Sequence, residues 1–302
     1  MATPPSAAKF AELLRAEGLT VVEVGDWEDH NRNHVGPWGP VHGVMIHHTV
    51  TRGSATTVDI CRHGYAELPG PLCHGVITKD GRVHLVGYGR ANHAGLGDDD
   101  VLQAVIAERA LPADDEANTD GNRHFYGFEC ENLGDGEDPW PGVQKEAIEK
   151  VAAAICRHHG WGAESAIRHL DWQPGKVDPR GIDWVAMRAR IAKRLGSAPP
   201  KSTPPPATTV VSLKRLLAAA RSNPSQPGTP VSYKGVATVE AALVDEGLLE
   251  RPYSDGHWGT KTTPAYAAWQ RRCGYRGDDA DGIPGPDSLR RLGLKHGFKT
   301  ED

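Results

Sequence analysis

A proline-rich segment over residues 196–209 is the feature that most restricts how this 302-residue chain can fold. It reads Gly-Ser-Ala-Pro-Pro-Lys-Ser-Thr-Pro-Pro-Pro-Ala-Thr-Thr, a composition that favours an extended, semi-rigid spacer over any packed element. The chain length also suits two ordinary domains. We therefore predict a domain over residues 1–196, a linker over 197–209 and a second domain over 210–302.

Overall charge and composition exclude several classes of partner. The formal net charge is -5 at pH 7, so no basic field exists to attract nucleic acid. No stretch of 18 apolar residues occurs, and the N-terminus lacks a basic region followed by an apolar run. The five cysteines form no C-x-x-C pair. We expect reduced thiols, no membrane span and no classical signal peptide.

The first domain alternates strand and helix patterns. Short apolar runs rich in β-formers predict strands over 43–48 and 125–131, and residues 74–86 read as a hairpin turning on Asp80-Gly81. Helical spacing of apolar residues predicts helices over 56–66, 143–158 and 183–195, the last capped by Asp183. An α/β fold with a mixed central β-sheet flanked by helices follows. A further helix over 7–17 belongs to residues 1–38, which we interpret as an accessory arm.

Two distant segments together predict a zinc site. His169, Lys176 and Asp178 lie on one short segment bent by proline and glycine, and the strand over 43–48 ends in His47 and His48. Successive strand residues point to opposite faces, so only one of this histidine pair can bind the same metal ion. Zinc takes imidazole and carboxylate ligands, and a catalytic zinc keeps one position for water. Two histidines and Asp178 therefore predict a zinc hydrolase.

The sequence around these residues resembles the amidase-2 family of N-acetylmuramoyl-L-alanine amidases, which includes peptidoglycan recognition proteins. The resemblance spans about residues 40–195 and rests on the segments Ile-His-His-Thr at 46–49 and Lys-Val-Asp-Pro at 176–179. In that family the first histidine of the strand motif binds zinc, which implies His47 as a ligand with His169 and Asp178. His48 is then expected to pack.

Other family motifs imply the remaining site residues. Tyr-Gly-Phe-Glu-Cys-Glu at 126–131 resembles the family's strand motif and implies Glu129 as the catalytic acid, with Glu131 as the alternative. Ala-Asn-His-Ala-Gly at 91–95 resembles a segment whose histidine lines the substrate groove. His93 and His74 are therefore expected to contact substrate. Where some members carry a catalytic tyrosine this chain has Cys73, which we interpret as a small groove or core residue.

The chemistry expected from this set is hydrolysis of an amide. Zinc lowers the pKa of bound water toward about 7, and a nearby carboxylate accepts the proton. That role falls to Glu129. Lys176, two residues before a ligand, is placed to stabilise the oxyanion together with zinc.

The second domain contains a short internal repeat. Asp-Gly-His-Trp-Gly-Thr-Lys-Thr at 255–262 recurs as Asp-Gly-Ile-Pro-Gly-Pro-Asp-Ser at 281–288, and such repeated turns imply two similar helix entries. The pattern is similar to the type 1 peptidoglycan-binding domain, which implies a small all-α module that holds the enzyme on its polymer.

The predicted function is zinc-dependent hydrolysis of the bond between N-acetylmuramic acid and L-alanine in bacterial peptidoglycan. A wall-binding module without a signal peptide favours a phage endolysin, made in the host cytoplasm and acting at the cell wall, and we expect a monomer. The alternatives are a non-catalytic peptidoglycan-binding protein and a zinc endopeptidase of the stem peptide.

Overall fold

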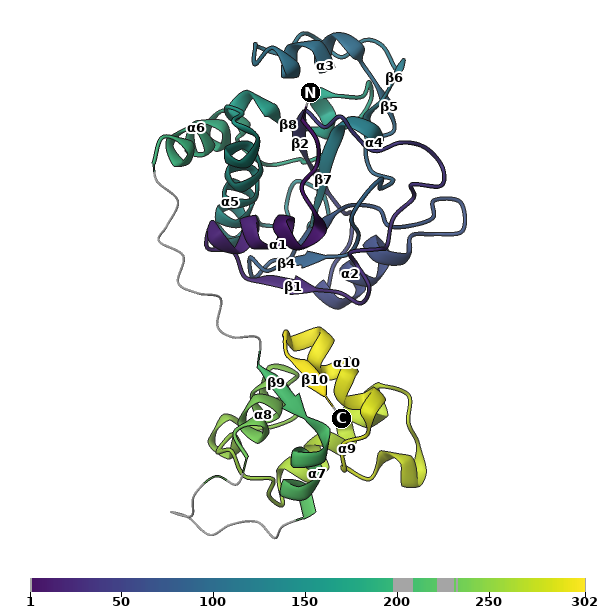
Figure 1. The fold of residues 1–302 in the computed structure, drawn as a ribbon, viewed down its shortest axis with the longest axis vertical. Coiled ribbons are helices and arrows are strands. Elements are labelled where there is room, and N and C mark those ends of the chain that lie inside the picture. The colour runs from purple at the N-terminus through teal and green to yellow at the C-terminus, as the bar shows by residue number, and fades with distance from the viewer. Residues whose placement is uncertain (1, 198–208, 222–230, 232, 302) are drawn as a thin grey trace. The chain divides into compact units, whose positions relative to one another are not determined.

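The computed structural model describes residues 2–197, 209–221, 231 and 233–301, and it divides into two compact units, Met1–Thr203 and Pro204–Asp302 (Figure 1). Each unit has its own hydrophobic core. The predicted linker over 197–209 lies almost entirely outside the described residues. Within the described ranges, no helix has the length and apolar character needed to cross a membrane.

A six-stranded mixed sheet forms the centre of the first unit. Its strand order is β1-β4-β3-β7-β2-β8, in which β3 and β4 pair antiparallel and the other neighbours pair parallel. The strands are β1 (Val21–Glu23), β2 (Gly43–His48), β3 (Gly75–Ile77), β4 (Val83–Leu85), β7 (Phe125–Cys130) and β8 (Ala166–Arg168). The predicted mixed α/β fold is confirmed, and so is the hairpin on Asp80-Gly81.

One face of this sheet is covered by three helices, α1 (Ala7–Ala16), α5 (Gly142–His159) and α6 (Trp184–Leu195) (Figure 1). Alternate strand residues supply the sheet side of this core, among them Val44, Ile46 and Phe128. Asp183 caps α6 by accepting a hydrogen bond from the Ala186 amide, as predicted. The helices predicted over 143–158 and 183–195 correspond to α5 and α6, and apolar residues of both helices face this core.

The opposite face is covered less completely. Helix α3 (Asp99–Ile106) packs on Met45 and Phe125, and α2 (Ser54–His63) packs on Val76. A short ribbon of β5 (Leu96–Gly97) and β6 (Thr119–Asp120) leads directly into α4 (Gly121–His124). This face carries the second set of alternating strand residues, and its polar members form the site described below.

Residues 1–38 differ from the arm expected from the sequence. Phe10, Leu14 and Trp27 are each at most 1% exposed and belong to the main core. The amphipathic pattern located α1 correctly, but it could not reveal that Phe10 stacks on Tyr126 of the central strand β7. The N-terminal segment is therefore part of the catalytic unit's core.

The second unit is helical, as expected, with one addition. Its elements are β9 (Val210–Ser212), α7 (Leu213–Arg221), α8 (Gly235–Asp245), α9 (Thr262–Arg272), α10 (Pro286–His296) and β10 (Lys299–Glu301), with short 3-10 turns at Arg251–Tyr253 and Gly277–Ala280. Strands β9 and β10 form a parallel pair that the sequence pattern did not indicate. Trp258, Trp269 and Tyr266 are buried in the core among these helices.

The internal repeat at 255–262 and 281–288 forms two equivalent turns. In the first, the Asp255 carboxylate accepts from the His257 amide, and Gly256 N–H donates to Glu240 of the preceding helix. In the second, Asp281 accepts from Ile283, and Gly282 donates to Gln270. Helices α9 and α10 begin shortly after these turns. The prediction of two similar helix entries is confirmed.

The repeat suggests a substitution at Glu240, which is fully buried and whose pKa burial raises to about 7. A raised carboxyl pKa stabilises the folded unit at low pH, and that contribution is lost as pH rises from about 4.5 to about 7. Gln270 holds the second turn without a charge, so Glu240→Gln should keep the turn and remove this loss. We expect the variant of residues 204–302 to gain about 2 to 3 kcal/mol over the unmodified unit between pH 4 and pH 8.

Urea unfolding of residues 204–302, followed by fluorescence of Trp258 and Trp269, measures this difference at each pH. Equal changes of unfolding free energy with pH in both proteins would contradict the prediction.

Candidate metal centre

Strand alternation aims His47 and Glu129 at the same face of the sheet. They are direct Cα partners across the parallel pair β2 and β7, one residue before each strand ends. Their strand neighbours Ile46 and Phe128 point to the other face, into the main core. The carboxyl ends of parallel strands are where α/β folds place their sites. His48 points away from His47, and its Nδ1 accepts from the Arg180 amide at 3.0 Å.

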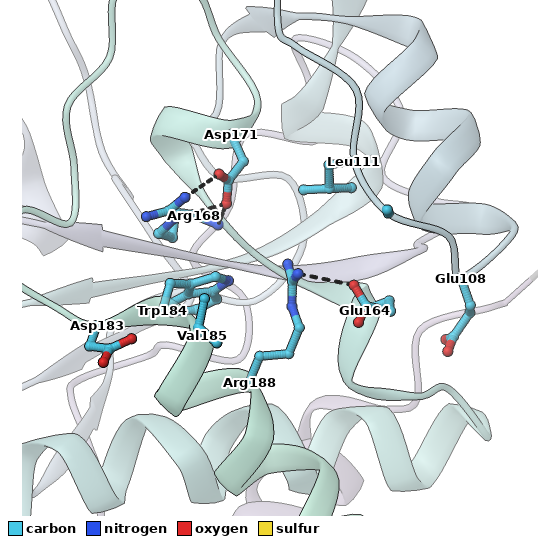
Figure 2. Close-up of a pocket in the computed structure, with 10 residues that line it drawn as sticks. Glu108, Leu111, Glu164, Arg168, Asp171, Asp183, Trp184, Val185 and Arg188 are labelled. Atoms are coloured by element: carbon cyan, nitrogen blue, oxygen red, sulfur yellow. Dashed lines mark hydrogen bonds and ion pairs between the residues drawn. The ribbon is translucent and has the colours of Figure 1, made fainter.

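His169 follows the neighbouring strand β8 directly, at the start of the 3-10 turn His169–Asp171. Asp171 holds this turn by accepting from the Arg168 amide at 2.9 Å and from its guanidinium at 2.7 and 3.0 Å. Figure 2 shows that ion pair at the edge of a cavity of about 540 Å³. The cavity is lined by neither His47, His169 nor Asp178, so it is separate from the candidate metal centre.

Asp178 is brought to His169 by a compact loop. Leu170 N–H donates to the Asp178 carbonyl at 2.9 Å, and Lys176 N–H donates to the Gln173 carbonyl at 3.1 Å. A third contact lies just beyond Asp178, where Trp140 Nε1 donates to the Arg180 carbonyl at 2.9 Å. The loop predicted from its proline and glycine residues is therefore fixed at both ends.

Three ligand atoms converge at this point. His47 Nδ1 lies 3.0 Å from His169 Nδ1, and each of these nitrogens lies 3.1 Å from Asp178 Oδ2. The side chains of His47, His169 and Asp178 are only 2%, 6% and 13% exposed. Among the described residues, these three form the one group of at least three histidine, cysteine or acidic side chains whose ligand atoms lie close enough together to hold a metal ion. The structure brings the three predicted ligands together.

The charges of this cluster favour a cation. Burial, reinforced by His169, lowers the pKa of His47 to about 4, so its imidazole is neutral at neutral pH. Burial opposes ionisation of Asp178, but the neighbouring rings of His169 and His47 outweigh it, and the pKa of Asp178 lies well below its usual range. Two imidazoles and one carboxylate form a donor set that fits zinc and other borderline divalent ions.

Glu129 lies beside this cluster. Its Oε2 is buried and has no hydrogen-bond partner among the residues that the structure describes. Burial, followed by the charge of Asp178, raises the pKa of Glu129 to about 8, and Lys176 opposes the shift. A buried carboxyl group with a free oxygen and a perturbed pKa is the signature of a proton-transfer residue. Lys176 itself is exposed and close enough to lower the pKa of both Glu129 and His47.

Residues 37–181 match the family model described as N-acetylmuramoyl-L-alanine amidase, Amidase_2. This part of the chain is an Amidase_2 domain. It contains all three converging ligands together with Glu129. The prediction of an N-acetylmuramoyl-L-alanine amidase is confirmed by this match.

Several solved structures are similar to parts of this chain. An endolysin N-acetylmuramoyl-L-alanine amidase, LysCS, from Clostridium intestinale URNW has 17% identity and a TM-score of 0.39, with 57% of this chain and 95% of that chain covered. The amidase AmiD from E. coli, in complex with a muropeptide substrate, has 15% identity and a TM-score of 0.38, covering 86% and 89%. Both TM-scores are under 0.5, so neither likeness supports an inference about the activity of this chain. A search of curated proteins finds no match.

Two predicted substrate contacts of the amidase domain are placed differently by the structure. His74 is fully buried, and its ring nitrogens contact the Gly89 carbonyl at 2.8 Å and the Gly127 amide at 3.0 Å. It is a packing residue, because no ring atom is left for a ligand. His93 is 8% exposed, and both of its ring nitrogens are also engaged, one of them with His47.

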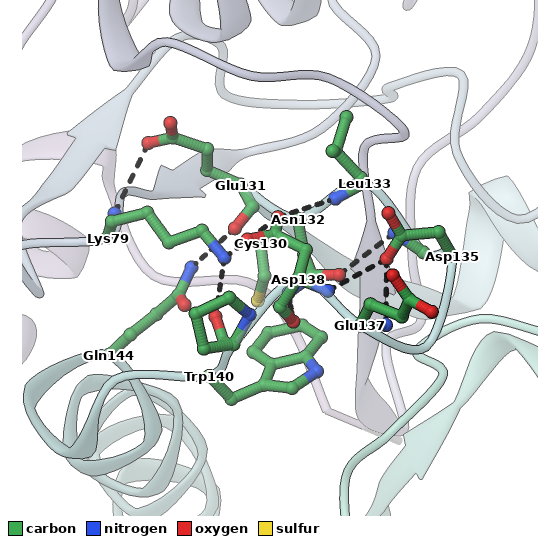
Figure 3. Close-up of polar contacts among 12 residues, drawn as sticks. Lys79, Cys130, Glu131, Asn132, Leu133, Asp135, Glu137, Asp138, Trp140 and Gln144 are labelled. Atoms are coloured by element: carbon green, nitrogen blue, oxygen red, sulfur yellow. Dashed lines mark hydrogen bonds and ion pairs between the residues drawn. The ribbon is translucent and has the colours of Figure 1, made fainter.

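Glu131, the alternative to Glu129, is also excluded from the centre. It lies beyond the end of β7 and accepts hydrogen bonds from Gly53 N–H at 2.9 Å and Ser54 Oγ at 2.6 Å, at the start of α2. Figure 3 shows its further contact with the Lys79 amide. Two residues of the same pattern thus have different roles, because the strand ends between them.

Cys73 belongs to a small core rather than to a groove. It is fully buried among Val58, Cys61, Val76 and Val86, between α2 and the sheet. A thiol enclosed by apolar side chains has no access to a substrate at the candidate metal centre.

Neither the contact of Gln173 with His169 nor the need for glycine at position 127 was predicted from the sequence. Gln173 Oε1 lies 3.2 Å from His169 Nε2, and a Cβ atom on Gly127 would lie 2.4 Å from Cγ of His93. Gln173 stands four residues after a predicted ligand, a spacing that could have drawn attention to it. The contact at Gly127 depends on a loop crossing the sheet and has no local signal.

Proposed function

We propose that this chain is a zinc-dependent amidase that hydrolyses the bond between N-acetylmuramic acid and L-alanine. The observation that carries the proposal is the buried cluster of His47, His169 and Asp178, with the unpartnered Glu129 beside it, inside the region that matches the amidase family. His47, His169 and Asp178 would hold the zinc ion. When bound, zinc supplies Lewis acidity toward water and the scissile carbonyl.

The chain's own residues supply proton transfer and charge. In its ionised form, Glu129 would accept a proton from the attacking water at its buried Oε2 and return it to the leaving amine. The exposed ammonium of Lys176 lies near the centre and would stabilise negative charge on the carbonyl oxygen. Burial of the ligands excludes bulk water, which strengthens both effects.

Digestion of purified peptidoglycan tests this function directly. New L-alanine amino termini should appear with the zinc-loaded chain and disappear when a chelator removes the metal. Amino termini of other stem-peptide residues would identify an endopeptidase instead. Binding to walls without release of either product would identify a recognition protein.

We propose further that residues 204–302 bind peptidoglycan. Support comes from the similarity of the repeated turns to a wall-binding module and from the unit's separate core. A tethered enzyme meets its polymer at a raised effective concentration. Two assays test this role. A chain ending at residue 203 should keep its activity on a small soluble muropeptide and lose activity in the digestion of intact walls. Equal wall activity would contradict this role.

Host lysis by a phage endolysin, and a monomeric state, stay predictions. Expression inside a bacterial host tests the first: lysis should follow only when the inner membrane is permeabilised. Sedimentation of the purified chain tests the second.

A further inference from the structure

Both candidate histidine ligands have their second ring nitrogen engaged. His47 Nε2 lies 3.1 Å from His93 Nδ1, and His169 Nε2 lies 3.2 Å from Gln173 Oε1. In each ring the other nitrogen, Nδ1, faces Asp178 Oδ2. The two histidines therefore have the same arrangement, with one nitrogen in the cluster and one held from outside.

The proton positions follow from the chemistry of the partners. His93 Nε2 lies 3.2 Å from the Phe125 carbonyl oxygen, which can only accept, so Nε2 of His93 carries a hydrogen. In a neutral ring Nδ1 is then an acceptor. His47 Nε2 must donate to it, which leaves His47 Nδ1 with a free lone pair inside the cluster. The chain runs from His47 through His93 to the backbone of β7.

His93 is fixed on both its backbone and its ring. Asn122 Oδ1, from α4, accepts from the amides of His93 and Ala94, each at 2.8 Å. The ring packs against Gly127 of β7, where a Cβ atom would lie 2.5 Å from His93 Nδ1. Asn122 is 7% exposed and His93 is 8% exposed. The loop therefore presents Nδ1 to His47 in one orientation.

His169 has the corresponding arrangement on the other side. The Gln173 carbonyl oxygen accepts from His169 Nε2, so Nδ1 of His169 also keeps its lone pair for the cluster. The backbone of Gln173 is held near His169, because its backbone N–H donates to the His169 carbonyl at 3.2 Å. Two unrelated segments thus select the same tautomer in two rings.

We propose that His93 and Gln173 are positioning residues that select the Nε2–H tautomer of His47 and His169 and so direct both Nδ1 atoms to the metal. The proposal rests on the proposed zinc site and assigns His93 to the metal centre instead of the substrate groove. Outer partners of this kind commonly change metal affinity by about 10- to 100-fold. His47 donates to the neutral ring of His93. This outer partner therefore adds no negative charge to the metal centre, as a carboxylate in the same place would.

Zinc affinity of the full chain, measured by competition with a chromophoric chelator, tests the proposal without requiring activity. His93→Leu should weaken zinc binding by about 10- to 100-fold. His93→Asn places a carbonyl oxygen near the Nδ1 position and should recover most of that loss. Gln173→Leu should weaken binding as His93→Leu does. His159→Leu, which alters a histidine that contacts Tyr126 outside the cluster, should leave affinity unchanged.

A second measurement reports the tautomer itself. Nitrogen-15 NMR of the zinc-loaded chain should show hydrogen on Nε2 of His47 and His169, and His93→Leu should change the Nε2–H signal of His47. Hydrogen on Nδ1 of His47 in the zinc-loaded, unmodified chain would overturn the proposal, even if His93→Leu failed to fold. So would a folded His93→Leu variant that binds zinc as tightly as the unmodified chain, or an Asn variant as weak as the Leu variant. Absence of zinc binding by the unmodified chain would overturn this proposal and the zinc-dependent function together.

Discussion

Glu129→Gln should bind zinc as tightly as the unmodified chain and lose about 10²- to 10⁴-fold in the rate of muropeptide hydrolysis. The carboxyl group is the cross-strand partner of His47, and its Oε2 is buried without a hydrogen bond. Glutamine keeps the shape of the side chain, so the sheet and the ligands should stay in place. It cannot accept a proton, so only the transfer step is lost. Steady-state rates with a soluble muropeptide, together with zinc competition, measure the two effects separately.

Glu131→Gln is the matched control for this prediction. The same substitution two residues later changes a carboxylate that binds the start of α2 through Gly53 and Ser54. We expect a loss of stability with the rate per folded molecule retained. If Glu129→Gln kept its rate while Glu131→Gln lost it, the assignment of the catalytic acid would be wrong.

His169→Ala should lose zinc binding and, with it, all measurable turnover. Its Nδ1 lies within 3.1 Å of both other ligand atoms, so its removal leaves His47 and Asp178 alone. A metal ion that binds only the folded state stabilises it by about 2.7 kcal/mol at a hundredfold excess over Kd. Zinc should therefore raise the melting temperature of the unmodified chain and leave that of the variant unchanged. Thermal melts with and without zinc measure this shift.

His48→Asn provides the control for the loss of a histidine. His48 is adjacent to His47 in the sequence but accepts from the Arg180 amide on the other side of the strand. An asparagine oxygen can accept the same hydrogen bond, so zinc should still raise the melting temperature. A zinc-dependent shift in His169→Ala as large as in the unmodified chain would exclude His169 as a ligand.

Much of the first unit could be predicted from local sequence patterns. The apolar run at 43–48, the turn at Asp80-Gly81 and the helical spacing over 143–158 each reflect a periodicity that backbone geometry imposes. The short strand β1 and the β9–β10 pair had no such signal, because three residues contain too few alternations to stand out. Their pairing depends on neighbours far away in the chain.

The candidate ligands were predictable, whereas several of their neighbours were not. His47, His169 and Asp178 stand in motifs with a fixed local spacing, and the structure brings them together. His74 and His93 are each in a recognisable motif too, but a motif does not state which way a ring faces. Their burial is decided by Gly127 and by the backbone carbonyls around them.

The sequence by itself determined the chemistry available to this protein: two imidazoles, a carboxylate ligand, a nearby acid and a second unit with repeated turns. Residue type and strand period are local properties, so they can be read without a fold. Only the tertiary structure decided that Glu129 and not Glu131 faces the metal centre, that Phe10, Leu14 and Trp27 belong to the main core, and that His93 contacts a ligand. These outcomes depend on strand ends, cross-strand register and loop crossings, which join residues far apart in the sequence, as in the His47 contacts with His93 and Asp178 at separations of 46 and 131.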